Sequence, residues 1–183
     1  MDRIFIVAQV LGFIVAGISF FTYIARKRSH ILMVKLVTDV LSAFQQAMLG
    51  AFTGSALNVI AVFREIVFYN RDKRKWASGI WWLFLFIAFM GAAPLLTWTG
   101  WICLLPSVGS ILAVIGFYIK NPTHTRIIGI FAQIFWLIYT IYTVNYSAIL
   151  CNALLIVSAI IGLIVDLWQY LKKRRESRSR EKQ

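Results

Sequence analysis

Long apolar stretches separated by short polar connections follow one another along the whole chain. Seven of them have about the 20 residues that a helix needs to cross the hydrocarbon core of a bilayer; they cover residues 4–24, 31–50, 55–70, 77–98, 101–119, 126–144 and 146–168. The pattern predicts an all-α integral membrane protein with seven transmembrane helices. The first stretch ends in "ARKRSH" instead of a small-residue cleavage site, so we expect a span there and not a signal peptide.

Composition and charge agree with this class of protein. Of the 183 residues, 60% are hydrophobic and only 14% are charged, and the mean hydropathy of +0.76 lies far from that of a soluble domain. The net charge is +12, and Lys and Arg gather at 26–28, 71–75, 120–126 and 172–182. The other three connections, at 51–54, 99–100 and 145, contain neither residue.

This alternation of basic and uncharged connections predicts the orientation of the chain. Cytoplasmic loops accumulate Lys and Arg, so we expect the N-terminus outside and the C-terminus in the cytoplasm. The basic loops and the tail are expected to meet anionic lipids. They are not expected to bind nucleic acid, because no aromatic surface accompanies them.

The chain contains weak evidence of an internal repeat. A shift of 94 positions places Asn58 on Asn152 and His30 on His124, and it superposes spans on spans and basic loops on basic loops. The repeat predicts two parallel three-helix units, at 1–76 and 99–171, joined by a linker helix at 77–98 and followed by a basic cytoplasmic tail at 172–183. The two units would be related by an axis along the membrane normal.

Polar residues in the predicted spans recur at helical spacing. In the second span a stripe with steps of 4, 3 and 4 contains Lys35, Asp39, Ser42 and Gln46, and the sixth span repeats it with Gly129, Gln133, Trp136 and Thr140. In the third span Ser55, Asn58 and Glu65 share a face, from which Arg64 points about 120° away. In the seventh span Asn152 begins a face that ends with Asp166. Lipid cannot satisfy such groups, so we expect the four stripes to face one another or water.

These features resemble two known groups of proteins. The segment "GAFTGSALNVIAVFREIVFYNRDKRKW", residues 50–76, is similar to the YgjV-like bacterial inner-membrane proteins. The two three-helix units, the lone fourth helix and an Asn on the last span of each unit resemble the SWEET, or MtN3, carriers of the PQ-loop superfamily. The chain departs from that pattern because Pro106 alone stands where the family has hinge prolines, and because the proline–glutamine motif is absent.

The resemblance implies a carrier for a small polar solute, in the bacterial inner membrane. In SWEET-type proteins the paired Asn residues and a residue on the second helix of each unit line the solute site. Those positions are Asn58, Asn152, Ser42 and Trp136 here, and the polar stripes add Gln133 and Gln46. The two amides can also serve only as helix-to-helix hydrogen bonds, and Trp136 can be packing bulk. Asn70 and Asn145, at the membrane edges, are expected to have no part in solute binding.

The charged residues of the second and third spans form a separate prediction. Lys35, Asp39, Arg64 and Glu65 lie toward the predicted cytoplasmic side, where a structural ion-pair cluster would let charges enter the bilayer as a neutral set. An inner gate or a proton-linked switch is the alternative. The second unit has Gly129, Gln133, Ser158 and Ala159 at the matching positions.

Catalytic and metal-binding signals are missing from the sequence. Both histidines lie in basic loops, and the two cysteines, Cys103 and Cys151, lie in separate spans, so no metal site, disulfide or cofactor is expected. No nucleophile elbow or phosphate loop is present, and we expect no enzyme. A membrane receptor or scaffold that does not transport remains the competing interpretation. The sequence says nothing about oligomeric state.

Overall fold

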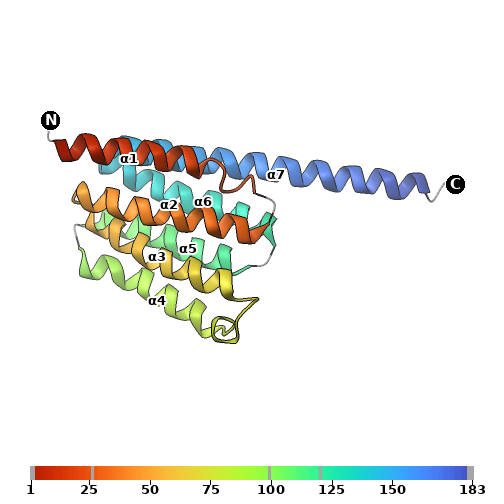
Figure 1. Ribbon diagram of the computed structural model, residues 1–183, viewed down its shortest axis with the longest axis horizontal. Helices are drawn as coiled ribbons and strands as arrows, with labels where there is room; N and C mark the ends of the chain where they lie inside the picture. The colour runs from red at the N-terminus through yellow and green to blue at the C-terminus, as the bar shows by residue number, and fades with distance from the viewer. Residues whose placement is uncertain (1–2, 26, 99, 120, 181–183) are drawn as a thin grey trace.

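The computed structural model describes residues 3–25, 27–98, 100–119 and 121–180, and in these residues the protein is helical throughout, with no strand (Figure 1). The α-helices are α1 (Arg3–Ser19), α2 (Arg28–Met48), α3 (Phe52–Asn70), α4 (Trp81–Leu96), α5 (Leu104–Tyr118), α6 (Pro122–Tyr142) and α7 (Tyr146–Arg180). Two short 3₁₀ turns, η1 (Lys75–Ala77) and η2 (Trp101–Cys103), precede α4 and α5. Five segments, those of α2, α3, η2 with α5, α6 and α7, are long and apolar enough to cross a membrane, whereas α1 and α4 have only 17 and 16 residues.

The helices pack in a closed circuit. Helix α1 packs on α2 and α7, α2 on α3, α3 on α5, α5 on α6, and α6 on α7, while α4 packs outside the circuit on α3 and α5 (Figure 1). Exchanging α1 with α5, α2 with α6 and α3 with α7 leaves the neighbours within the circuit unchanged, although α4 packs on one side of it only. The packing therefore has the pairwise relation that a two-fold repeat requires.

The two ends of the bundle differ in charge. Because successive helices run in opposite directions (Figure 1), the connections after α1, α3 and α5 and the end of α7 lie together. The first two connections contain Lys27 and the basic run 71–75, and His124 and Arg126 lie near the start of α6, which follows the third. We call this the basic end. The connections after α2, α4 and α6 lie at the opposite, neutral end, and their described residues carry no charge.

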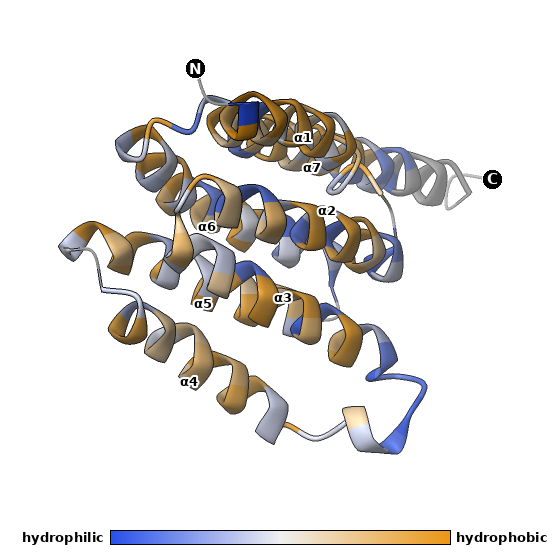
Figure 2. Ribbon diagram, turned by 60° about the vertical axis from the view of Figure 1, so that its left-hand side comes forward, coloured by the Kyte–Doolittle hydropathy of each residue, from blue (hydrophilic) through white to orange (hydrophobic). Residues whose placement is uncertain are grey.

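Apolar side chains cover the outside of the bundle. Phe44, Phe63, Phe131 and Ile164, on four different helices, are 57–65% exposed, and the hydrophobic colouring extends over α1 and α4 (Figure 2). Buried positions include many polar residues instead, among them Asp39, Arg64, Glu65 and Arg126, each at most 3% exposed. An apolar exterior around a polar interior is the distribution expected for a protein whose solvent is lipid.

Two helix ends differ from the predicted spans by five residues or more. Helix α1 ends at Ser19 instead of 24, since the guanidinium of Arg126 binds the carbonyl oxygens of Tyr23 and Ala25 and the Tyr23 amide donates to Ser158 Oγ, which holds this segment outside a helix. Helix α7 runs on without a break to Arg180, so the predicted tail at 172–183 begins as a continuation of the last helix.

Candidate functional site

The centre of the circuit contains a cavity of about 60 Å³. Its walls come from all six helices of the circuit and from none of α4, and they include Gly12, Val15 and Ser19 of α1 and Ser110, Ala113 and Phe117 of α5. By this measure a single water needs about 10–15 Å³, so the cavity has room for several waters or one very small solute. Polar side chains from the helices of the circuit therefore converge on one space at the centre of the bundle.

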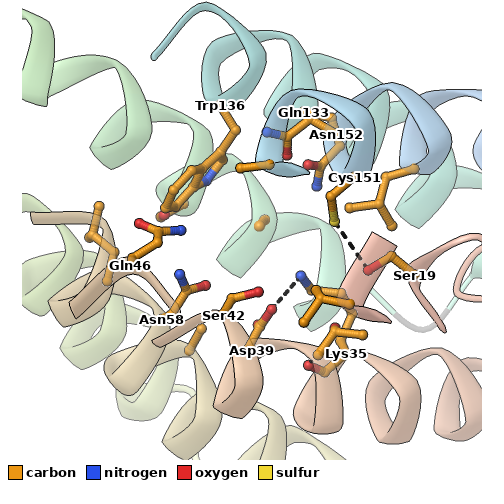
Figure 3. A pocket seen from close by; sticks show the side chains of 18 of the residues that line it. Ser19, Lys35, Asp39, Ser42, Gln46, Asn58, Gln133, Trp136, Cys151 and Asn152 are labelled. Carbon is orange, nitrogen blue, oxygen red and sulfur yellow. Dashed lines mark hydrogen bonds and ion pairs between the residues drawn. The ribbon is translucent and has the colours of Figure 1, made fainter. Parts of the chain in front are cut away.

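All six residues predicted to bind a solute line this cavity. From the first half of the chain come Ser42, Gln46 and Asn58, and from the second half come Gln133, Trp136 and Asn152; the two groups lie on opposite sides in Figure 3. The amide side chains are 5–7% exposed, so water reaches them little. These members of the predicted stripes thus share one cavity, whereas Gly129 and Ser55 do not line it, and the binding of a solute by the six residues stays a prediction.

The two paired Asn residues are held in similar ways. Asn58 Nδ2 donates to the carbonyl oxygen of Gly54, one turn earlier on α3, at 3.0 Å. Asn152 Nδ2 donates to Thr140 Oγ1, on α6, at 3.2 Å. Each amide donates one N–H to the protein and retains a carbonyl oxygen and a second N–H, so each can still accept and donate a hydrogen bond to a polar ligand.

Two glycines give the polar side chains of the cavity their room. A Cβ on Gly54 would lie 1.6 Å from Gln46 Oε1, a buried oxygen that has no hydrogen-bond partner in the described part of the chain. A Cβ on Gly109 would lie 2.9 Å from Cδ1 of Trp136 and 2.7 Å from the carbonyl oxygen of Ala132. Any larger residue at either position would push a cavity side chain out of place.

The charged residues form one cluster at the end of the cavity nearer the basic loops. Lys35 Nζ donates to Asp39 Oδ1 at 2.5 Å, and Arg64 Nη2 lies 2.5 Å from Glu65 Oε1 and 3.8 Å from Asp39 Oδ2. Arg64 and Glu65 are 2% and 0% exposed. Two cations and two carboxylates give a formal charge of zero, which is the condition under which buried charges are tolerated.

Arg64 differs from the sequence prediction. Its backbone position points away from Asn58, yet its side chain lines the same cavity, with the guanidinium 5.0 Å from the centre of the Phe117 ring. A long side chain can turn toward charged partners regardless of where its Cβ points. Glu65 was predicted on the Asn58 face, but it does not line the cavity and is enclosed behind Arg64.

A second buried charge, missed from the sequence, closes the basic end. Arg126 is 1% exposed and pairs with Asp166 on α7 while donating to the Tyr23 and Ala25 carbonyl oxygens. Gly162 makes room for it, because a Cβ there would lie 2.5 Å from Arg126 Nε. The sequence analysis assigned Arg126 to a basic loop and therefore missed this role. Asp166, on the polar face of the seventh span, was the signal in the sequence that a cation lies opposite it.

The neutral end is closed by uncharged hydrogen bonds. Gln45 Nε2 donates to Asn145 Oδ1 at 3.2 Å and to Ser147 Oγ at 2.7 Å, and the Ser147 amide donates to Gln9 Oε1. We call Gln9, Gln45, Asn145 and Ser147 the amide layer. Asn145 also caps α7 through the Ala148 amide. Asn145, which was expected to have no part in solute binding, is thus a buried residue of this layer, and its absence from the solute site stays a prediction.

In the described residues no three His, Cys, Asp or Glu side chains are grouped as a metal site would require.

Comparison with known proteins places the chain in a family. No curated protein and no solved structure matches the chain. A family model described as a bacterial inner membrane protein, Imp-YgjV, matches residues 6–169, which is most of the sequence. The chain accordingly belongs to the Imp-YgjV family of bacterial inner membrane proteins.

Proposed function

We propose that the protein is a carrier that moves a small polar solute across the inner membrane by alternating access, without chemical change of the solute. The observation that carries the proposal is the central cavity, which Asn58 and Asn152 line from the two halves of the chain. A static receptor or scaffold has no need of a polar cavity at the centre of a bundle with an apolar exterior, since burying unpaired polar groups there costs stability.

The finer architecture of the proposal is a pair of parallel three-helix units joined by α4, of the SWEET type, with all seven helices crossing the membrane. The pairwise exchange of neighbours in the helix circuit supports this division. So does the collection of the basic connections at one end (Figure 1). The proposal places the basic end in the cytoplasm, against anionic lipids, and the N-terminus outside.

A topological experiment checks this placement. Reporter fusions at the C-terminus are expected to report the cytoplasm, and fusions at Gly100 are expected to report the outside, because positive loops are retained in the cytoplasm. The measurement is the activity of a periplasmic reporter and of a cytoplasmic reporter at each site. The opposite result at either position would remove the seven-span arrangement.

Substitution of the paired amides tests the solute site. We expect Asn58→Ala and Asn152→Ala each to reduce solute affinity about two- to tenfold, since one net hydrogen bond contributes about 0.5–1.5 kcal/mol. The two effects should be similar, and the double variant should be close to inactive. The measurements are uptake into proteoliposomes and solute-induced thermal stabilisation, over a panel of small polyols, sugars, nucleosides and amides.

The matched control is Asn70→Ala. The Asn70 side chain donates to the carbonyl oxygen of Ile66 on its own helix, at the end of α3, and does not line the central cavity. We expect wild-type uptake from this variant. If a solute is transported and both inner Asn variants carry it at the wild-type rate, the two amides serve only hydrogen bonds within the protein and the solute site lies elsewhere. If no solute of the panel is bound or moved and the cavity is closed to water, the receptor or scaffold interpretation replaces the carrier.

A further inference from the structure

A second hollow lies at the neutral end, next to the central cavity. It has a volume of about 610 Å³ and lies between the start of α1, the end of α2 and the turn from α6 to α7. Gln9 and Asn145 are in its wall. Among the described residues, none that lines it is charged. We call this hollow the vestibule.

The amide layer links the wall of the vestibule to the wall of the central cavity. Gln45 lines the central cavity and donates to Asn145, which lines the vestibule. Ser147 accepts from Gln45 at 2.7 Å and donates to Asn145 Oδ1 at 3.1 Å. Direct hydrogen bonds between neutral groups therefore connect a residue of one wall to a residue of the other.

Two details indicate that the layer can exchange partners. Gln9 Oε1 accepts from the Ser147 amide, whereas Gln9 Nε2 is buried with no hydrogen-bond partner among the residues that the structure describes. Gly12 is the residue that lets the layer form, since a Cβ there would lie 2.1 Å from Ser147 Oγ and 2.5 Å from Gln45 Nε2. A solute with a free acceptor would satisfy the unpaired donor, and neutral amides can trade hydrogen bonds at little net cost.

We propose that the amide layer is a second solute-binding station, at which a neutral, hydrogen-bonding solute from the vestibule replaces the internal bonds of Gln45 and passes to the central cavity. This inference rests on the proposed carrier function. The layer selects against ions, because an ion would have to leave water for a wall without a compensating charge. The basic end, in contrast, is closed by the ion pairs of Arg64 and Arg126.

The native Cys151 supplies the test, because it lines the central cavity. In a Cys103→Ala background, which removes the other, fully buried cysteine, the labelling rate of Cys151 is measured in nanodiscs. The probes are a neutral hydroxyethyl methanethiosulfonate and a cationic trimethylammonium analogue. We expect the neutral reagent to label at least fivefold faster than the cation after correction for their rates with a free thiol.

Variants of the layer identify the route that the reagent takes. Gln45→Ala and the similarly sized Gln45→Met are each expected to raise the labelling rate roughly fivefold or more, because each lost hydrogen bond changes an opening equilibrium about two- to tenfold. Gly12→Ala keeps Gln45 but places a methyl group against Gln45 and Ser147, so it should displace the layer and act in the same direction. Thr143→Ala, on the vestibule wall outside the layer, should label as the parent does.

An unchanged labelling rate in folded Gln45→Met and Gly12→Ala would overturn the inference, as would equal labelling by the two reagents. Labelling does not require transport, so the outcome separates from that of the carrier proposal. If flux depends on Asn58 and Asn152 but the Gln45 variants do not change the labelling rate, the proposal of a second station is wrong and the carrier proposal stands. A Gln45-dependent route into a cavity that transports nothing from the panel would remove the carrier alone.

Discussion

Glu65→Gln protein is expected to accumulate poorly and to unfold at a lower temperature than the parent. The substitution leaves Arg64 and Lys35 with only Asp39 as a counter-charge, so the buried cluster acquires a net positive charge. Removing one partner of a buried ion pair costs about 3–5 kcal/mol, and Glu65 has no exposed surface through which water could compensate. The measurement is thermal unfolding in detergent, with expression level as a second readout.

A neutral double variant is the control for that result. Lys35→Met with Glu65→Gln removes one charge of each sign, and we expect it to recover a large part of the stability lost in the single variant. Losses that simply add in the double variant would contradict a shared neutral cluster. Uptake per folded molecule should survive in Glu65→Gln. A stable Glu65→Gln protein that has lost its flux, or its response to pH, would assign the carboxylate to coupling instead.

Arg126→Met is expected to be the second strongly destabilising change, at about 3 kcal/mol. It removes the partner of Asp166 and the two bonds that hold the Tyr23 and Ala25 carbonyl oxygens after α1. We place the cost at the lower end of the range for a broken buried pair because the Asp166 side chain is 29% exposed. The measurement is the same thermal unfolding, with proteolysis at the segment after α1 as a local readout.

His124→Ala gives the matched control, since this exposed residue lies on the first turn of the same helix. Wild-type stability is expected from it. Preserved stability in Arg126→Met would show that the short α1 is held by its apolar contacts with α2 and α7 alone.

The helical periodicity of polar residues predicted the positions of side chains that follow from the direction of the Cβ. It did not predict positions that depend on a long side chain or on a hydrogen bond to the backbone. The stripes of α2 and α6 located Ser42, Gln46, Gln133 and Trp136 on the cavity wall because each Cβ fixes the face of a helix on which these side chains lie. Arg64 and Arg126 reach their partners through three methylene groups, so the helical wheel does not describe their ends. The early end of α1 depends on Arg126, which is 103 positions from Tyr23, and no local pattern contains that information.

The positions of Lys and Arg in the sequence predicted which connections lie at the same end of the bundle. They gave no information about the amide layer. Basic connections separated one end from the other, and the structure gathers them as that pattern requires (Figure 1). The amide layer has no charge and draws on three distant segments, so its members look like ordinary loop and helix-end residues in the sequence. Asn145 is an example: a lone Asn in a short turn is typical of a solvent-facing position, but here it is 4% exposed.

The unbroken course of α7 has a mechanical consequence. Its 35 residues form a rod of about 52 Å, of which roughly 30 Å is enough to cross the hydrocarbon core. The remaining length is a rigid extension of the same helix, which also carries Asn152 and Asp166. A tilt of α7 by about 10° about its first turn would sweep the far tip through about 9 Å. Small displacements in the middle of the bilayer are thus converted into large ones in the water beyond the basic end, where a probe on the rod could read them.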